Sequence, residues 1–189
     1  RLFDRNVLKS DTVNMPIICV GNLSVGGTGK SPMVEYLLRL LKDQFVTATL
    51  SRGYKRKTKG YALANESSTA LEIGDEPMQF HVKFPDVTVA VGEERLEAIP
   101  QLLHDRPKTE VIILDEPFAN LDPTTQIRLK KIIKELAEDP SVTILVSSHD
   151  LQHTVEVCNR IVALNKGEVV KDIQTSEETL QELEAFFAV

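Results

Sequence analysis

The stretch from Gly21 to Pro32 reads Gly-Asn-Leu-Ser-Val-Gly-Gly-Thr-Gly-Lys-Ser-Pro. It follows a short apolar run, Pro16 to Val20, and precedes apolar residues that are spaced as on one face of a helix. Glycines in such a loop let consecutive backbone N–H groups wrap a phosphate, and the helix N-terminus adds partial positive charge. The stretch therefore predicts a phosphate-binding loop between a strand and a helix.

Within this loop, each residue type has an expected task. Lys30 would reach the β- and γ-phosphates of a nucleotide, and the Ser31 hydroxyl would ligate Mg²⁺. Ser24 stands where the usual pattern has its first glycine, and Gly26 and Gly27 can supply the flexibility. The alternative is a glycine-rich turn with a solvated lysine. The expected phosphate-binding residues are Gly26, Gly27, Thr28, Gly29, Lys30 and Ser31.

A second chemical signal is the apolar run Val111 to Leu114, which ends in Asp115 and Glu116. In a nucleotide-hydrolysing fold, the first acid holds Mg²⁺ and the second orients or deprotonates the attacking water. A solvated strand end would give the same pattern. Together with the loop, however, the pair predicts a metal site at Ser31 and Asp115 and a general base at Glu116.

Strand-like and helix-like segments alternate along the chain, which predicts a mainly parallel sheet covered by helices on both faces. With the phosphate-binding loop, this pattern predicts a P-loop NTPase fold, a three-layer α/β/α sandwich. The expected strands are Ile17 to Gly21, Val46 to Ser51, Val87 to Val91, Val111 to Asp115, Thr143 to Ser148 and Ile161 to Leu164.

Two helix starts and one hairpin are also predicted. Asp122 can cap a helix that has Pro123 in its first turn. Residues 165–167 predict a hairpin turn. Thr175 with Glu178 three residues later resembles a capping box for a last helix.

Composition limits the possible functions. The chain has 189 residues, 42% of them hydrophobic, which favours one domain spanning residues 1–189. A net charge of −6 argues against nucleic-acid binding, for which a basic face is expected. Cys19 and Cys158 have no metal-ligand or disulfide spacing, and no apolar run reaches the length of a membrane span. We expect a soluble, cytoplasmic, monomeric protein with reduced thiols.

Residues 1 to about 114 resemble the N-terminal part of tetraacyldisaccharide 4'-kinase, which phosphorylates a lipid A precursor at the bacterial inner membrane. The resemblance rests on three motifs in order: the loop from Val20 to Lys30, Leu-Ser-Arg-Gly-Tyr at 50–54, and Gly-Asp-Glu-Pro at 74–77. It implies ATP as cofactor and Asp75 as catalytic residue, although Asp75 could instead cap a helix. The basic run from Arg52 to Lys59 could make weak peripheral contact with anionic lipid or be a solvated loop.

From about residue 111 to 189 the chain instead resembles the C-terminal half of an ABC-transporter ATP-binding subunit. The matching motifs are Leu-Asp-Glu-Pro at 114–117, Asn-Leu-Asp-Pro at 120–123 and Ser-Ser-His-Asp at 147–150. This resemblance implies that Glu116 is a general base and His149 a γ-phosphate sensor. The Leu-Ser-Gly-Gly-Gln signature of that family is absent from the sequence, which argues against coupled transport.

We therefore interpret the chain as a chimera, kinase-like over residues 1–112 and ABC-ATPase-like over 113–189, that forms a single composite domain. An engineered fusion, a natural fusion or an assembly artefact would each give this sequence. The expected function is an ATP- and Mg²⁺-binding core with at most slow ATP hydrolysis. Lipid A 4'-kinase activity, an ABC-type ATPase fragment and a folded scaffold without nucleotide remain alternatives.

Overall fold

The computed structural model describes residues 17–22, 30–165 and 168–187, and for residues 17–22, 30 and 31 it describes the backbone alone. The described residues form a sheet of eight strands in the order β3-β4-β2-β5-β6-β1-β7-β8. The strand bounds are β1 Ile17–Asn22, β2 Thr47–Ser51, β3 Ala62–Leu63, β4 Thr88–Val91, β5 Val111–Asp115, β6 Thr143–Ser148, β7 Arg160–Asn165 and β8 Glu168–Gln174.

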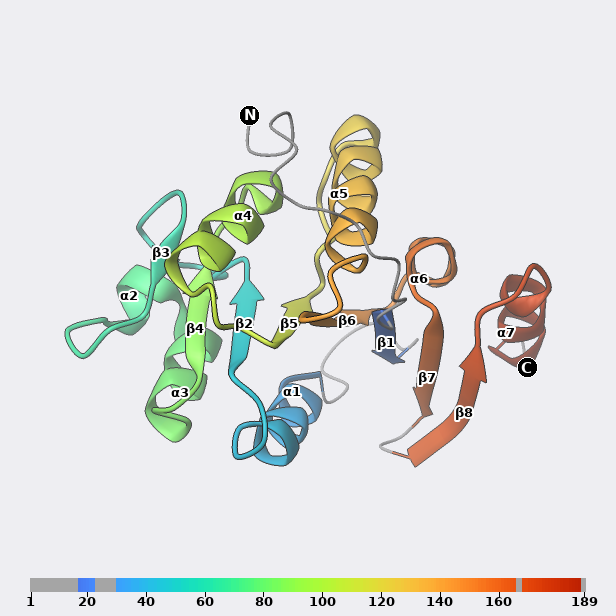
Figure 1. Ribbon diagram of the computed structural model, residues 1–189, viewed down its shortest axis with the longest axis horizontal. Coiled ribbons are helices and arrows are strands. Elements are labelled where there is room, and N and C mark those ends of the chain that lie inside the picture. The colour runs from blue at the N-terminus through green and yellow to red at the C-terminus, as the bar shows by residue number, and fades with distance from the viewer. Residues whose placement is uncertain (1–16, 23–29, 166–167, 188–189) are drawn as a thin grey trace.

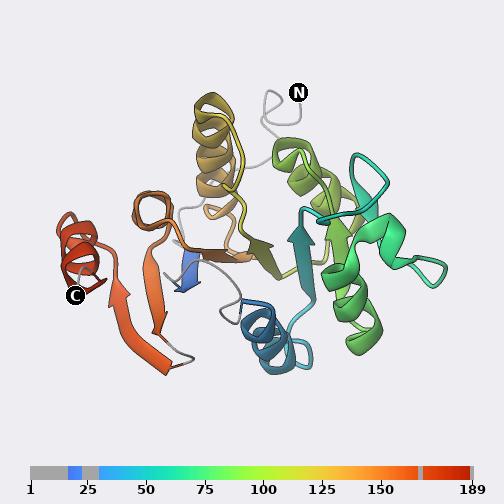
Figure 2. The same ribbon diagram turned by 180° about the vertical axis from the view of Figure 1, so that it is seen from behind.

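The centre of the sheet is parallel, and its two edge strands, β3 and β8, pair antiparallel. Strand β1 lies between β6 and β7, and β5 lies between β2 and β6 (Figures 1 and 2). The carboxyl ends of these parallel strands meet at one edge of the sheet, where ligands bind in folds of this type. The α/β fold and the mainly parallel sheet expected from the sequence are confirmed.

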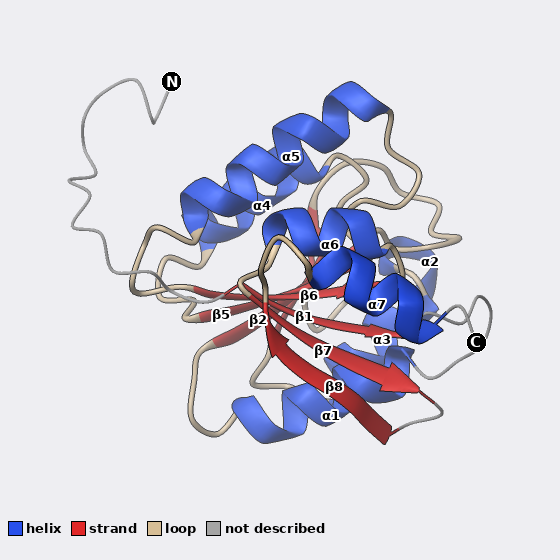
Figure 3. Ribbon diagram, turned by 90° about the vertical axis from the view of Figure 1, so that its right-hand side faces the viewer, coloured by secondary structure: helices blue, strands red, loops and turns tan. Residues whose placement is uncertain are grey.

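Helices cover both faces of the sheet (Figure 3). Helices α4, α5, α6 and α7 pack on one face, and α1 and α3 pack on the other. The helix bounds are α1 Lys30–Leu41, α2 Ala70–Ile73, α3 Asp75–Lys83, α4 Arg95–Asp105, α5 Pro123–Leu136, α6 Leu151–Val157 and α7 Thr179–Phe187.

The central strand β5 shows why its sequence is a continuous apolar run rather than an alternating one. Ile112 and Leu114 pack in the cluster under α4 and α5, whereas Val111 and Ile113 pack in the cluster under α1 and α3. A parallel strand covered on both faces buries every side chain. Only Asp115, at its carboxyl end, is half-buried.

Helix α5 starts where the sequence predicts. The Asp122 side chain accepts a hydrogen bond from the backbone N–H of Thr125 at 3.1 Å, and Pro123 occupies the first turn. This cap satisfies one of the backbone donors that a helix start leaves without a partner.

The capping box predicted at Thr175 is wrong. Helix α7 begins at Thr179, and the Thr175 hydroxyl donates to the Cys158 carbonyl oxygen at 2.5 Å. The Thr179 hydroxyl instead accepts from the Ser176 N–H at 2.8 Å. Because Thr175 ties the end of β8 to the end of α6, its side chain is not available to start the helix. Cys158 itself is a buried free thiol, as expected.

Asp75 is also not a helix cap. The cap of α3 is Gly74, and Asp75 with Glu76 fills the first turn. Carboxylates are favourable there because the helix N-terminus carries partial positive charge.

Candidate functional site

A cavity of about 300 Å³ lies at the carboxyl ends of β2 and β5. Four carboxylates line it, and three cationic side chains line it as well. The acidic residues are Asp75, Glu76, Asp115 and Glu116, and the basic residues are Arg52, Lys55 and Arg95. The fold thus brings Asp75 to the same cavity as the Asp115–Glu116 pair, although the two motifs are far apart in the sequence.

Asp115 is fixed by the neighbouring strand. Strands β5 and β6 place Asp115 opposite Ser147, and the Ser147 hydroxyl donates to Asp115 Oδ1 at 2.5 Å. A hydrogen bond to a carboxylate orients it and favours its charged form. Ser147 therefore fixes the orientation of the Asp115 carboxyl group at the carboxyl end of β5.

Glu116 follows at a sharp turn of the backbone. Its φ is +44°, a left-handed conformation that is uncommon for residues other than glycine. The turn is held because the Glu116 N–H donates to the Ser147 carbonyl oxygen at 3.0 Å. Strain of this kind is found where a structure must aim a particular side chain.

The turn directs Glu116 toward His149. Glu116 Oε1 lies 2.8 Å from His149 Nδ1, and His149 directly follows β6. A carboxylate in hydrogen-bond contact with an imidazole can hold or accept a proton beside a reacting group. The structure thus brings together the two residues that the sequence analysis assigned to hydrolysis.

Two glycines explain how the motifs at 50–54 and 74–77 meet. Gly53 has φ +73° and Gly74 has φ +98°. A methyl group at Gly74 would lie 3.1 Å from the Gly53 carbonyl carbon, and one at Gly53 would lie 2.8 Å from the Ile73 carbonyl oxygen. The two backbones touch, and this contact places Asp75 beside Arg52 at the cavity.

The basic loop from Arg52 to Lys59 divides into two kinds of residue. Arg56 is a structural residue: its side chain is 2% exposed, and its Nη2 lies 2.6 Å from Glu93 Oε2. It also donates to the Gly60 carbonyl oxygen. The remaining cations of the run are exposed, namely Arg52, Lys55, Lys57 and Lys59. Of the two alternatives offered for this run, the solvated loop therefore does not hold at Arg56.

The ion pair between Arg56 and Glu93 should make the stability of the folded protein depend on pH in the acid range. Burial acts to raise the pKa of Glu93, but hydrogen bonds from its own backbone and from Arg56 outweigh it and lower that pKa. A carboxyl group whose pKa is lower in the folded than in the unfolded protein stabilises the fold at pH values above its unfolded pKa. This stabilisation is lost as the pH falls through its folded pKa. We expect the stability difference between the parent and Arg56→Met to shrink between pH 7 and pH 3.

Urea denaturation at both pH values measures this change. Lys57→Met is the matched control, because Lys57 is an exposed cation on the same loop. A difference for Arg56→Met that stays constant with pH would show that Arg56 acts through packing rather than through Glu93.

Arg95 is a residue of the site that sequence analysis missed. It begins α4, is 4% exposed and lines the cavity. No motif marks it, and a single arginine before an apolar stripe looks like a solvated first-turn residue. Its burial follows only from the packing of α4 on β4 and β2.

The predicted phosphate-binding residues fall between the end of β1 and the first turn of α1 in the sequence. Gly26, Gly27, Thr28 and Gly29 lie outside the described residues. Lys30 and Ser31 are the first two residues of α1, in the expected place after β1. Neighbouring strands lie about 4.8 Å apart, so β5, one strand beyond β6, lies about 10 Å from β1.

Among the described helices, none has the length and apolar character needed to cross a bilayer.

Comparison with known proteins gives a family match in the first two thirds of the chain. The family model for tetraacyldisaccharide-1-P 4'-kinase matches residues 1–127, which extends beyond the 114 residues of the resemblance noted above. A tetraacyldisaccharide 4'-kinase from Flavobacterium johnsoniae is 56% identical over 62% of this chain and 34% of its own length. The corresponding protein from Parabacteroides distasonis is 50% identical over 68% of this chain and 36% of its own. The chain thus spans about a third of the length of these curated relatives.

Solved structures resemble the whole chain more distantly. An ATP-binding cassette of an ABC transporter in its ADP conformation has a TM-score of 0.57 at 12% identity, covering 92% of this chain and 85% of its own. A dimeric ATP-binding cassette bound to ADP and Pi has a TM-score of 0.53 at 16% identity, covering 87% and 88%. These likenesses show the fold. The chain shares the α/β architecture of P-loop NTPases.

Proposed function

The chain belongs to the tetraacyldisaccharide-1-P 4'-kinase family, and from this premise we propose that it is an ATP- and Mg²⁺-binding core with at most slow ATP hydrolysis. The observation that supports this most is the convergence of Asp115, Glu116 and His149 at one sheet edge. Strand β1 ends at the same edge, and α1 starts at Lys30. A phosphate cradle after β1 would therefore lie at the same sheet edge as the acidic pair, with β6 between them.

Mg²⁺ would be held by Ser31 and Asp115. Asp115 fits this task because the Ser147 hydroxyl holds one of its oxygens in place at the carboxyl end of β5. Hydroxyl, carboxylate and water oxygens are the ligands that Mg²⁺ prefers. When bound, the ion would offset the negative charge of the β- and γ-phosphates. Gly26 to Gly29 and Lys30 would supply backbone N–H groups and one ammonium group to the same phosphates.

Hydrolysis would depend on Glu116 and His149. Glu116 would orient a water molecule toward the γ-phosphate and accept its proton, while His149 at 2.8 Å would fix the carboxylate. Positioning contributes most of the rate in phosphoryl transfer, and the water must be aligned with the leaving oxygen. A site without a second subunit to close it would turn over slowly.

We further propose that the chain is a composite single domain joined near Val111 to Asp115. The family match ends at residue 127 of 189, whereas the likeness to ATP-binding cassettes spans most of the chain. The sheet interleaves the two parts: β1 and β2 come from the first part, and β6, β7 and β8 from the second. Neither part has a complete sheet alone, which supports one folding unit.

A second candidate function is phosphorylation of a lipid A precursor, with Asp75 as the residue that activates the acceptor hydroxyl. Asp75 lines the same cavity as Asp115, and the family match covers it. Peripheral contact with anionic lipid through the exposed cations of the 52–59 loop would serve this activity. Because the chain spans about a third of its relatives, we rank this activity below nucleotide binding.

Calorimetric titration of the purified chain with ATP, with and without Mg²⁺, tests the proposed function. We expect saturation that is tighter with Mg²⁺. A chain that melts cooperatively but binds no ATP under either condition would refute nucleotide binding and support the scaffold alternative.

Replacing Glu116 with glutamine should separate binding from hydrolysis. The amide keeps the size of the side chain but cannot accept the proton of water, so we expect ATP affinity within about twofold of the parent and release of phosphate reduced at least about 100-fold. Phosphate release under saturating ATP measures the rate. Asp139→Asn is a suitable control, because Asp139 caps a turn beyond α5. If Glu116→Gln releases phosphate as fast as the parent, Glu116 is not the residue responsible for hydrolysis.

A further inference from the structure

Arg95 is a buried cation at the cavity whose bonds go to neutral groups. Its Nη1 donates to the carbonyl oxygens of Gly92 at 2.5 Å and Glu93 at 3.2 Å. In the part of the chain that the structure describes, these bonds hold one edge of the guanidinium, and it forms no ion pair. Arg95 also lines the cavity described above.

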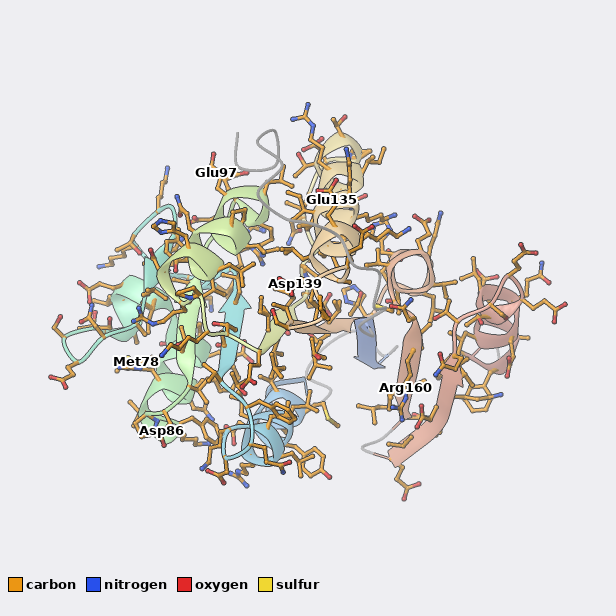
Figure 4. The ribbon with its side chains drawn as sticks, viewed as in Figure 1. Met78, Asp86, Glu97, Glu135, Asp139 and Arg160 are labelled. Atoms are coloured by element: carbon orange, nitrogen blue, oxygen red, sulfur yellow. The ribbon has the colours of Figure 1, made fainter. Side chains whose placement is uncertain are left out.

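The carboxylates near Arg95 compensate this charge only in part: Asp115 and Glu93 act to raise its pKa, but among the described residues neither forms an ion pair with it. Glu97 is the acidic residue in the first turn of α4, and it is exposed and points away from the sheet (Figure 4). Glu93 is paired with Arg56 instead. Burial, and then the neighbouring charge of Arg52, lowers the pKa of Arg95 to about 10. A buried cation that no carboxylate contacts directly is costly, and an anionic group bound in the cavity would offset that cost.

The position of Arg95 indicates what that ligand is. Arg95 follows β4, while the nucleotide loop follows β1 on the other side of β2, β5 and β6. It is therefore on the opposite side of β5 from the phosphate-binding loop. The fork of a guanidinium matches the oxygens of a phosphoryl group.

We propose that Arg95 binds a phosphoryl group in this cavity, either the γ-phosphate of ATP as it extends past Asp115 or a phosphate on a second ligand. The γ-phosphate case rests on the proposed function, whereas the second-ligand case does not. Four carboxylates share the cavity, so an anion is favoured there only beside the guanidinium groups. Arg52, also at the cavity and exposed, is the second cation that such a group would meet.

The test compares Arg95→Gln with the parent in three titrations: ATP, ADP, and inorganic phosphate added to protein saturated with ADP and Mg²⁺. If Arg95 binds the γ-phosphate, the variant loses at least about tenfold in ATP affinity and keeps its ADP affinity. If Arg95 binds a second ligand, the parent binds inorganic phosphate beside ADP, and the variant loses that binding at least about tenfold. Arg106→Gln, at the far end of α4 and exposed, should match the parent in all three.

Unchanged affinities for all three ligands in a folded Arg95→Gln would overturn the proposal. Arg95→Lys covers the case in which glutamine prevents folding, because it keeps the charge but loses the fork, and the same losses are expected. If the parent binds no ATP, the proposed function fails by itself. Inorganic phosphate titrated into the nucleotide-free parent and Arg95→Lys then decides the role of Arg95, and equal binding or no binding in the two refutes it.

Discussion

Replacing Lys30 with alanine should weaken ATP binding at least about 100-fold, because the variant loses charge-assisted hydrogen bonds to the β- and γ-phosphates. Lys30 is the first residue of α1, directly after the predicted phosphate-binding loop. The ammonium group is a point charge that backbone N–H groups cannot replace. Calorimetric titration with ATP and Mg²⁺ measures the loss.

Lys42→Ala is the matched control, because Lys42 lies just past the other end of α1 and pairs with Asp43 at 2.6 Å. We expect this variant to bind ATP as the parent does. Equal ATP affinity in Lys30→Ala and the parent would refute the assignment of the phosphate-binding loop. Equal losses in both lysine variants would point instead to a nonspecific effect of charge.

The strands that are buried on both faces of the sheet could be predicted from the sequence. Strands β5 and β6 have the bounds that were predicted, because their apolar runs end sharply at charged or polar residues. The same strands position Asp115, Glu116 and His149, so the acidic pair and the histidine could be placed at one edge from topology alone. Helix α5 was equally predictable, since Asp122 and Pro123 are strong local signals.

Features that depend on packing between distant segments could not be predicted. The edge strand β3 is two residues long and exists only through its pairing with β4. Thr175 has the sequence of a cap, but its hydroxyl donates to the carbonyl oxygen of Cys158, the residue that follows α6. The buried states of Arg56 and Arg95 are set by where the 52–60 loop and α4 lie in the fold. In each case the local sequence is compatible with several environments, and tertiary contacts select one.

Alanine at Gly53 or Gly74 should reduce the free energy of unfolding by about 2–4 kcal/mol, from the strain of a positive φ together with a backbone clash. A methyl group at Gly53 would lie 2.8 Å from a carbonyl oxygen, and one at Gly74 would lie 3.1 Å from the Gly53 backbone. Both of these neighbours are backbone atoms, although the Arg56 Cδ atom would lie nearer still to the Gly53 methyl group, at 2.6 Å. Urea denaturation of the two variants measures the loss.

Gly60→Ala separates the two causes, because Gly60 has φ +78° but no atom within 4 Å of the added methyl group. This variant should lose only the cost of the backbone conformation, about 1 kcal/mol. If Gly53→Ala and Gly74→Ala lose no more than Gly60→Ala, the close contact between the two motifs does not exist in solution. A larger loss in Gly74→Ala, whose added methyl group would meet only backbone atoms of Gly53 and Tyr54, would show that the motifs at 50–54 and 74–77 are in contact through their glycines. That contact is what places Asp75 at the cavity, so Gly74→Ala should also disturb any activity that needs Asp75.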